Sequence, residues 1–158
     1  MKPLIPLGLA AALFAGAAYA TDTTSPTDVV ADPVTIWQDD KSNRFDAVDV
    51  DLGTFQWIAR PVIVFADTPA DPRFLEQIAL LDDRLEALTE RDVVIITDTD
   101  PAALSDVRTR LRPRGFMLVL IGKDGGVKLR KPFPWDVREI SRSIDKMPMR
   151  QQEIRAGG

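Results

Sequence analysis

The sequence predicts an α/β domain with a mixed four-stranded sheet and helices on both faces of that sheet. Short, continuously apolar runs rich in β-branched residues, at residues 61–66 and 93–97, are typical of central strands covered on both sides. A third strand is expected at residues 116–121. Amphipathic stretches separate the first strands, so the expected order along the chain is β-α-β-α-β-β-α.

An Asp-Pro pair opens each of the first two predicted helices. Asp71-Pro72 supplies an N-cap followed by proline at the first helical position, and apolar side chains then recur every three or four residues. This spacing predicts one helix that ends near Arg91. Asp100-Pro101 repeats the start signal for a second helix, and a strand-helix-strand order predicts a right-handed parallel connection. The inward side chains of the second helix are expected to be Leu104, Val107 and Leu111.

The last part of the chain predicts a hairpin followed by a helix. The Asp-Gly step within residues 122–126 is typical of a tight turn between antiparallel strands. Residues 127–130 then alternate apolar and cationic side chains, as exposed edge strands do when charge protects them from pairing with other chains. The final helix is expected at residues 136–147, with Pro148 as its stop.

The first 20 residues have the pattern of a secretory signal peptide. Lys2 precedes an apolar stretch that ends at Ala18-Tyr19-Ala20, a typical cleavage site. The apolar stretch is shorter than the roughly 20 residues that a bilayer span needs, so we expect cleavage and no transmembrane anchor in the product. The expected location is therefore the bacterial periplasm or the outside of the cell. The predicted divisions are a signal peptide at 1–20, a flexible lead-in at 21–35, a folded domain at 36–154 and a disordered tail at 155–158.

Composition excludes several kinds of chemistry. The chain has no cysteine and no histidine, which removes Ser-His-Asp and Cys-His nucleophile systems, Cys/His zinc sites and CxxC redox pairs. Charge is uneven: residues 21–106 hold 19 acidic against 6 basic side chains, and residues 107–158 hold 5 against 13. The basic part either attracts the acidic part within one domain or forms a face for an anionic partner. Nucleic acid is not expected as that partner, because the product is acidic overall and exported.

The predicted order of elements is the minimal thioredoxin arrangement, and three segments resemble one branch of it. These segments are residues 57–66, 122–130 and 144–153. They are similar to the bacterial DUF4174 family, and the resemblance extends over residues 52–154. It implies a thioredoxin-like or peroxiredoxin-like fold, an exported setting and a non-catalytic role.

The position at which such a fold carries its reactive group holds no thiol here. In a working thioredoxin-like enzyme the reactive cysteine follows the first central strand at the start of the next helix, where the helix dipole lowers its pKa. In this chain residues 67–72 read Asp-Thr-Pro-Ala-Asp-Pro. We therefore expect neither thiol-disulfide exchange nor peroxidase activity. The cis-proline of such enzymes also lacks a clear match, and Pro113 is the nearest proline.

Three aspartates follow the predicted parallel strands. Asp67, Asp98 and Asp100 are expected at the strand ends where open α/β sheets bind ligands. Their oxygens could hold Mg²⁺ or Ca²⁺, which would make the chain a carboxylate-dependent or metal-dependent enzyme. Helix capping for Asp100 and strand-to-loop turns for Asp67 and Asp98 explain the same residues without a metal.

Basic residues of the last two strands and the neighbouring helix ends form a possible partner surface. Its members are Arg112, Arg114, Lys123, Lys128, Arg130 and Arg150. Such a surface suits an unknown protein or an anionic component of the cell envelope. Basic residues at helix ends and on edge strands also occur for structural reasons alone. The leading interpretation is an exported, redox-inactive binding or accessory module without a cofactor, and the alternative is the aspartate-based enzyme.

Overall fold

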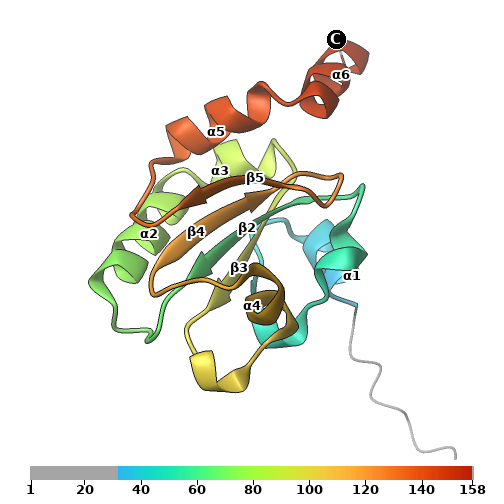
Figure 1. Ribbon diagram of the computed structural model, residues 1–158. Coiled ribbons are helices and arrows are strands. Elements are labelled where there is room, and N and C mark those ends of the chain that lie inside the picture. The colour runs from blue at the N-terminus through green and yellow to red at the C-terminus, as the bar shows by residue number, and fades with distance from the viewer. Residues whose placement is uncertain (1–31, 158) are drawn as a thin grey trace, which may run out of the picture. The chain divides into compact units, whose positions relative to one another are not determined.

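The structure, a computed structural model, describes residues 32–157, so the predicted signal peptide lies outside the described residues. One sheet with helices around it makes up this part of the chain (Figure 1). The elements in chain order are α1 (Pro33–Asp39), β1 (Arg44–Asp46), η1 (Ala47–Asp49), η2 (Leu52–Phe55), β2 (Arg60–Phe65), α2 (Pro72–Asp83), α3 (Leu85–Thr89), β3 (Val93–Asp98), η3 (Pro101–Ala103), α4 (Asp106–Leu111), β4 (Met117–Ile121), β5 (Val127–Lys131), α5 (Val137–Asp145) and α6 (Pro148–Ala156).

The sheet has five strands in the order β1-β3-β2-β4-β5. The first three strands in the chain are parallel to one another, whereas β4 runs antiparallel to β2 and β5 runs antiparallel to β4. The four predicted strands and the mixed pairing are confirmed. The expected count of four was wrong, because the short strand β1 pairs with the outer side of β3. Acidic and isolated apolar residues surround β1 in the sequence, so no continuous apolar run predicted this strand.

Each face of the sheet packs on its own group of helices, as predicted. Ile63 and Phe65 of β2 point into a cluster that includes Trp37 of α1 and Val107 of α4. The alternate side chains of the same strand, such as Val62, enter the opposite cluster, which α2, α3 and α5 cover. Figure 1 shows α5 and α2 on one side of the sheet and α4 on the other. Alternation of side chains along a strand produces these two cores from one continuously apolar run.

The first long helix of the prediction is two helices. α2 ends at Asp83 and α3 begins at Leu85, because Arg84 between them leaves the helical region with φ −134° and ψ 37°. Neither proline nor glycine stands at this point, and nothing in the local sequence signals the break. Leu81 and Leu88 are nevertheless both buried in the same core, so the predicted apolar stripe holds across it.

The second predicted helix begins later than its Asp-Pro signal. The Asp100 carboxylate accepts from the Ala102 amide, but only the 3₁₀ turn η3 follows. Leu104 ends that turn with φ 47° and is 72% exposed, so its expected place in the core was wrong. The Ser105 hydroxyl then caps α4 by accepting from the Arg108 amide. A second cap so close to the first restarts the helix in another direction.

The ends of the domain also differ from the expectation. α1 begins at Pro33, within the predicted lead-in, and buries Val34. Pro148 ends no helical structure; it occupies the first turn of α6, where the missing N–H of proline costs nothing. α6 extends to Ala156, into the predicted tail. None of the described helices is long and apolar enough to cross a membrane.

The packing of α1 can be tested at Trp37, which is 2% exposed and whose indole Nε1 donates to the Val93 carbonyl at 3.3 Å. We predict that Trp37→Phe lowers the free energy of unfolding by about 1–3 kcal/mol, because the carbonyl loses its donor and the smaller ring leaves space. Val48→Ala serves as the control, since Val48 is 55% exposed. Urea denaturation measures both variants. Equal stability of the two would contradict the packing of α1 on the sheet.

Candidate binding site

The sheet end at which a redox cysteine would lie holds a loop of exposed side chains. Residues 67–70 follow β2 and are all exposed. Asp71 then caps α2, since its carboxylate accepts from the Arg73 amide at 2.9 Å and from the Arg73 side chain at 3.0 Å. Hydrogen bonds from the Arg73 side chain and amide hold the pKa of Asp71 below its usual value. A capped helix start therefore occupies the place where thiol-disulfide exchange or peroxide reduction would need a thiolate. The described residues contain no cis peptide bond, the one before Pro113 included.

Asp98 at this end of the sheet is paired with an arginine. Its carboxylate is 3% exposed and accepts from Nη2 of Arg108 at 2.7 Å and from Nε at 2.9 Å. The Ser105 hydroxyl donates to the other carboxylate oxygen at 2.6 Å. Arg108 also donates to the Ala66 carbonyl at 2.8 Å and lies over the ring of Phe65. The pair thus fastens α4 to the ends of β2 and β3.

The three predicted aspartates do not gather into one metal site. Asp67 is exposed and lies 3.8 Å from the Arg108 guanidinium. The Asp100 carboxylate accepts a hydrogen bond from the Ala102 amide and so caps η3. No group of three carboxylates suited to a metal ion occurs within residues 32–157. The Arg108 guanidinium, rather than a metal ion, neutralises the buried Asp98 carboxylate. The sequence did not indicate this role of Arg108.

At the opposite end of the sheet an arginine is buried almost completely. Arg60, the first residue of β2, is 1% exposed. Its guanidinium donates to the Arg91 carbonyl at 2.8 Å and to the Glu153 carboxylate at 2.9 Å. A buried charge is tolerated only where partners replace its water. Glu153 of α6 therefore lies at this end of the sheet beside Arg60, although 93 residues separate them in the chain.

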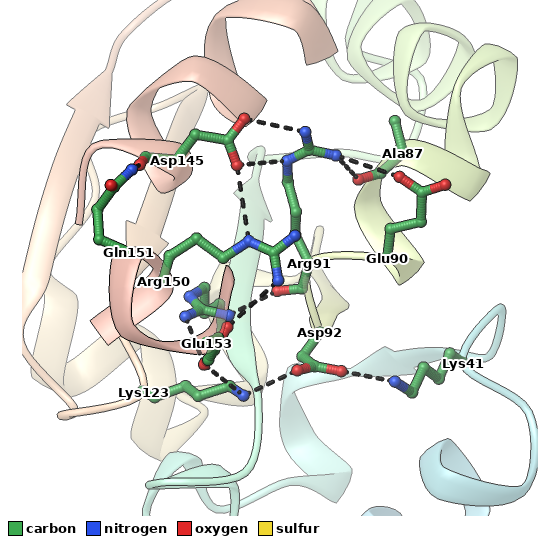
Figure 2. A network of polar contacts seen from close by, with 11 residues as sticks. Lys41, Ala87, Glu90, Arg91, Asp92, Lys123, Asp145, Arg150, Gln151 and Glu153 are labelled. Atoms are coloured by element: carbon green, nitrogen blue, oxygen red, sulfur yellow. Dashed lines mark hydrogen bonds and ion pairs between the residues drawn. The ribbon is translucent and has the colours of Figure 1, made fainter. Parts of the chain in front are cut away.

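Through Glu153, Arg60 belongs to a larger ionic network, and Figure 2 labels the other members of it. Lys123 bridges Glu153 at 2.9 Å and Asp92 at 2.8 Å, and Lys41 reaches the second oxygen of Asp92. On the other side, Arg150 lies between Glu153 and Asp145. Arg91 holds Asp145 through two hydrogen bonds of 2.9 Å. We call this set the ionic network: Lys41, Arg60, Arg91, Asp92, Lys123, Asp145, Arg150 and Glu153.

The network keeps the carboxylates of Asp92 and Glu153 ionised. Burial alone would raise the pKa of Glu153, but hydrogen bonds from Arg60 and Lys123 outweigh burial and hold the pKa below its usual value. Burial acts in the same direction on the pKa of Asp92, and the bonds from Lys123 and Lys41 again lower it. Both groups are therefore anions at neutral pH that depend on the lysines and arginines around them.

A cavity of about 230 Å³ opens beside the network. Arg60 and Lys123 of the network form part of its wall, and the segment from Met147 to Met149 forms another part. The remaining wall residues are Gly122, Asp124 and Lys128 of the β4–β5 hairpin. The segments 57–66, 122–130 and 144–153, which carried the family resemblance, thus meet around one cavity and one ionic network.

The six basic residues of the predicted partner surface divide into two groups. Lys123, Lys128 and Arg150 belong to the network or to the cavity wall. Arg130 instead donates to the Leu111 carbonyl at 2.7 Å, beside α4. Arg112 and Arg114 are exposed in the connection between α4 and β4. The six residues therefore have different contacts in the structure.

Several residues of this site had no role in the sequence reasoning. No spacing pattern in the sequence links Arg60, Asp92 and Asp145. The one signal in the sequence was the basic pair Lys123 and Arg150. The resemblance segments also contained Arg60, Asp145 and Glu153 without showing that they touch, and the remaining members of the network lie outside these segments.

Solved structures with a similar fold are peroxiredoxins. The reduced 2-Cys peroxiredoxin of Plasmodium vivax matches 65% of this chain and 85% of its own at 16% identity, with a TM-score of 0.54. Thioredoxin peroxidase I of Plasmodium yoelii matches 65% of this chain and 80% of its own at 19% identity, with a TM-score of 0.50. At these identities the likeness shows the fold, which is thioredoxin-like, and this chain carries that fold without cysteine.

The family itself is defined by the sequence match. The domain of unknown function DUF4174 matches residues 51–153, so the chain belongs to the DUF4174 family. The match ends at Glu153, the residue that pairs with Arg60. The predicted family and the predicted thioredoxin-like fold are both confirmed.

The acid sensitivity of the ionic network provides a test. Because the folded-state pKa of Glu153 is lowered from 4.5, its contribution is present above that pH and is lost as the pH falls through the folded-state value. We predict that Glu153→Gln lowers the free energy of unfolding by about 1–2 kcal/mol at pH 7 and that the difference from the wild type shrinks towards pH 3. Chemical denaturation over this pH range measures it. A difference independent of pH would contradict the ion pairing.

The pairing of Asp98 provides a second test, with Asp100 as its matched control. We predict that Asp98→Asn lowers the free energy of unfolding by about 2–4 kcal/mol, because it leaves the Arg108 charge without its counter-ion. Asp100→Asn is expected to be almost neutral, since asparagine caps helices as well as aspartate does. Thermal denaturation with and without 5 mM Mg²⁺ or Ca²⁺ reads both effects. A melting temperature that rises with either cation in the wild type and not in Asp98→Asn would contradict the arginine assignment.

Proposed function

We propose that this chain is an exported, redox-inactive thioredoxin-like binding module whose recognition site is the ionic network with its cavity. The observation that carries the proposal is the cation-rich cavity wall at the sheet end opposite to the cysteine position. A scaffold that holds charged side chains in fixed positions before binding loses less entropy when a partner arrives. The module recognises a protein or an anionic component of the cell envelope.

Export is part of the proposal and is supported by the signal-peptide pattern of residues 1–20. Removal of that segment would place the product in the periplasm or outside the cell. Anionic polymers and lipid head groups are abundant in that setting. Recognition of negative charge by clustered Lys and Arg is a general electrostatic effect, and it weakens with salt.

The enzyme alternative has less support from the geometry. Asp98 is already neutralised by Arg108, and Asp100 is occupied as a cap. The Asp98 carboxylate is 3% exposed, and both of its oxygens already accept hydrogen bonds from Arg108 or Ser105, so it is closed to a substrate. Asp67 is exposed on the loop after β2 and lies 3.8 Å from the Arg108 guanidinium.

Site-directed photocrosslinking in living cells tests the binding module. A photoreactive amino acid at Met149, in the cavity wall, is expected to yield a defined covalent product. The same amino acid at Leu75, which is 55% exposed on α2 near the cysteine position, serves as the matched control and is expected to yield none. The mass of the product distinguishes a protein partner from an envelope component, and the N-terminus of the purified chain reports cleavage after Ala20.

Two outcomes would contradict the proposal. A product at Leu75 alone would place recognition at the other end of the sheet. Absence of any product at Met149, in cells where the chain is exported and folded, would remove the cavity as a recognition site. An uncleaved chain that stays in the cytoplasm would contradict export. The crosslinks at Met149 and Leu75 would then still test the recognition site.

A further inference from the structure

The cavity beside the ionic network has one apolar side. Met147, Pro148 and Met149 form it, and the methylene groups of Lys123 and Lys128 face the same space. At about 230 Å³ the cavity equals the volume of roughly eight molecules of liquid water, at about 30 Å³ each. Its size and its wall therefore suit a small ligand with an apolar part.

The charged side of the cavity wall holds three cations, Arg60, Lys123 and Lys128, and one carboxylate, that of Asp124. The ionic network joins five basic side chains to three carboxylates. Glu90 adds a fourth carboxylate beside Arg91, but its side chain is 64% exposed and cations still outnumber anions. At the rim, Lys128 is balanced by Asp124. An anion in the cavity would bring this partly buried cluster closer to neutrality, in surroundings where charge interactions are stronger than in water.

Hydrogen-bond donors without a protein acceptor lie at the same place. The Nε of Arg60 is buried and has no partner among the described residues, although Nη1 and Nη2 each donate to an acceptor. The N-terminus of α6, which begins in the cavity wall, has no side-chain cap. The amides of Met149 and Arg150 in its first turn have no acceptor within the helix. A buried guanidinium donor and an uncapped helix start are both groups that bind anions.

From these three observations we infer that the cavity binds a small amphiphilic carboxylate, with its carboxylate at Arg60 and the start of α6 and its apolar part against Met147 and Met149. This inference rests on the proposed binding function and names the ligand class for the same site. The two oxygens of a carboxylate match the few free donors. Inorganic phosphate, by contrast, would leave the apolar side of the cavity empty.

Titration of the ¹⁵N-labelled full chain with straight-chain carboxylates from butyrate to decanoate tests the inference by NMR. The amides of Gly122, Met149 and Arg150 are expected to shift, and those of Asp67, Thr68, Ala70 and Asp71 to stay in place. Each added methylene should tighten binding about fourfold while it is buried. The gain should stop at roughly eight carbons, where the volume of the cavity is filled. Hexanamide, which has the same length without the charge, should bind at least tenfold more weakly than hexanoate.

Variants locate the binding. Met149→Trp fills the apolar side and is expected to weaken hexanoate binding at least tenfold. Lys128→Met keeps the apolar stem but removes a charge at the rim, and should weaken binding about threefold at low salt. Arg138→Met removes the same charge from an exposed position on α5 outside the cavity wall, and should leave binding unchanged.

The results separate this inference from the proposed function. Equal shifts with inorganic phosphate and hexanoate, or shifts that do not grow with chain length, would overturn the amphiphilic carboxylate. Absence of shifts at Met149 with every carboxylate at 10 mM would overturn it as well. In either case a crosslinked partner at Met149 would leave the binding module standing, whereas loss of that crosslink would remove the proposed function itself.

Discussion

The structure depends on the burial of one positive charge. Arg60 starts a strand in the middle of the sheet, where its guanidinium is out of contact with solvent. A charge in that position needs oxygen partners, and the chain supplies the Arg91 carbonyl and the Glu153 carboxylate. This requirement draws the C-terminal helix α6 onto the end of the sheet, and the cavity wall comes with it. α6 itself buries no residue fully, so its place is set by ion pairs rather than by an apolar core.

The same fold is used differently at its two ends. At the end where thioredoxin-like enzymes carry a thiolate, Asp98 and Arg108 form a closed pair that binds α4 to β2 and β3. The Nε and Nη2 donors of Arg108 and the Ser105 hydroxyl all have acceptors, so the pair stabilises the fold and offers little to a ligand. At the opposite end, free donors and excess positive charge remain after all ion pairs are counted. The contrast between a satisfied pair and an unsatisfied network is the physical reason to place recognition at the second end.

Much of the fold was predictable from local patterns. The two parallel strands, the hairpin and the two-faced core follow from apolar runs and from their alternation, because burial on both faces leaves a clear record in the sequence. Errors arose where local signals compete. Asp100 caps a 3₁₀ turn and Ser105 caps the helix after it, and only packing decides which cap begins the longer helix. The short strand β1 escaped notice because three residues at a sheet edge need no apolar run.

The sequence by itself determined the fold class, the family and the absence of a thiol, since each of these is written in contiguous residues. It also marked Lys123 and Arg150 as cations of interest. Only the tertiary structure decided that they share the carboxylate of Glu153 with Arg60. Ion pairs between residues as distant as positions 60 and 153 leave no periodicity in either segment, because a single charge fits many local environments. Their partners are chosen by the topology of the sheet, which places the start of β2, the β4–β5 turn and the start of α6 side by side.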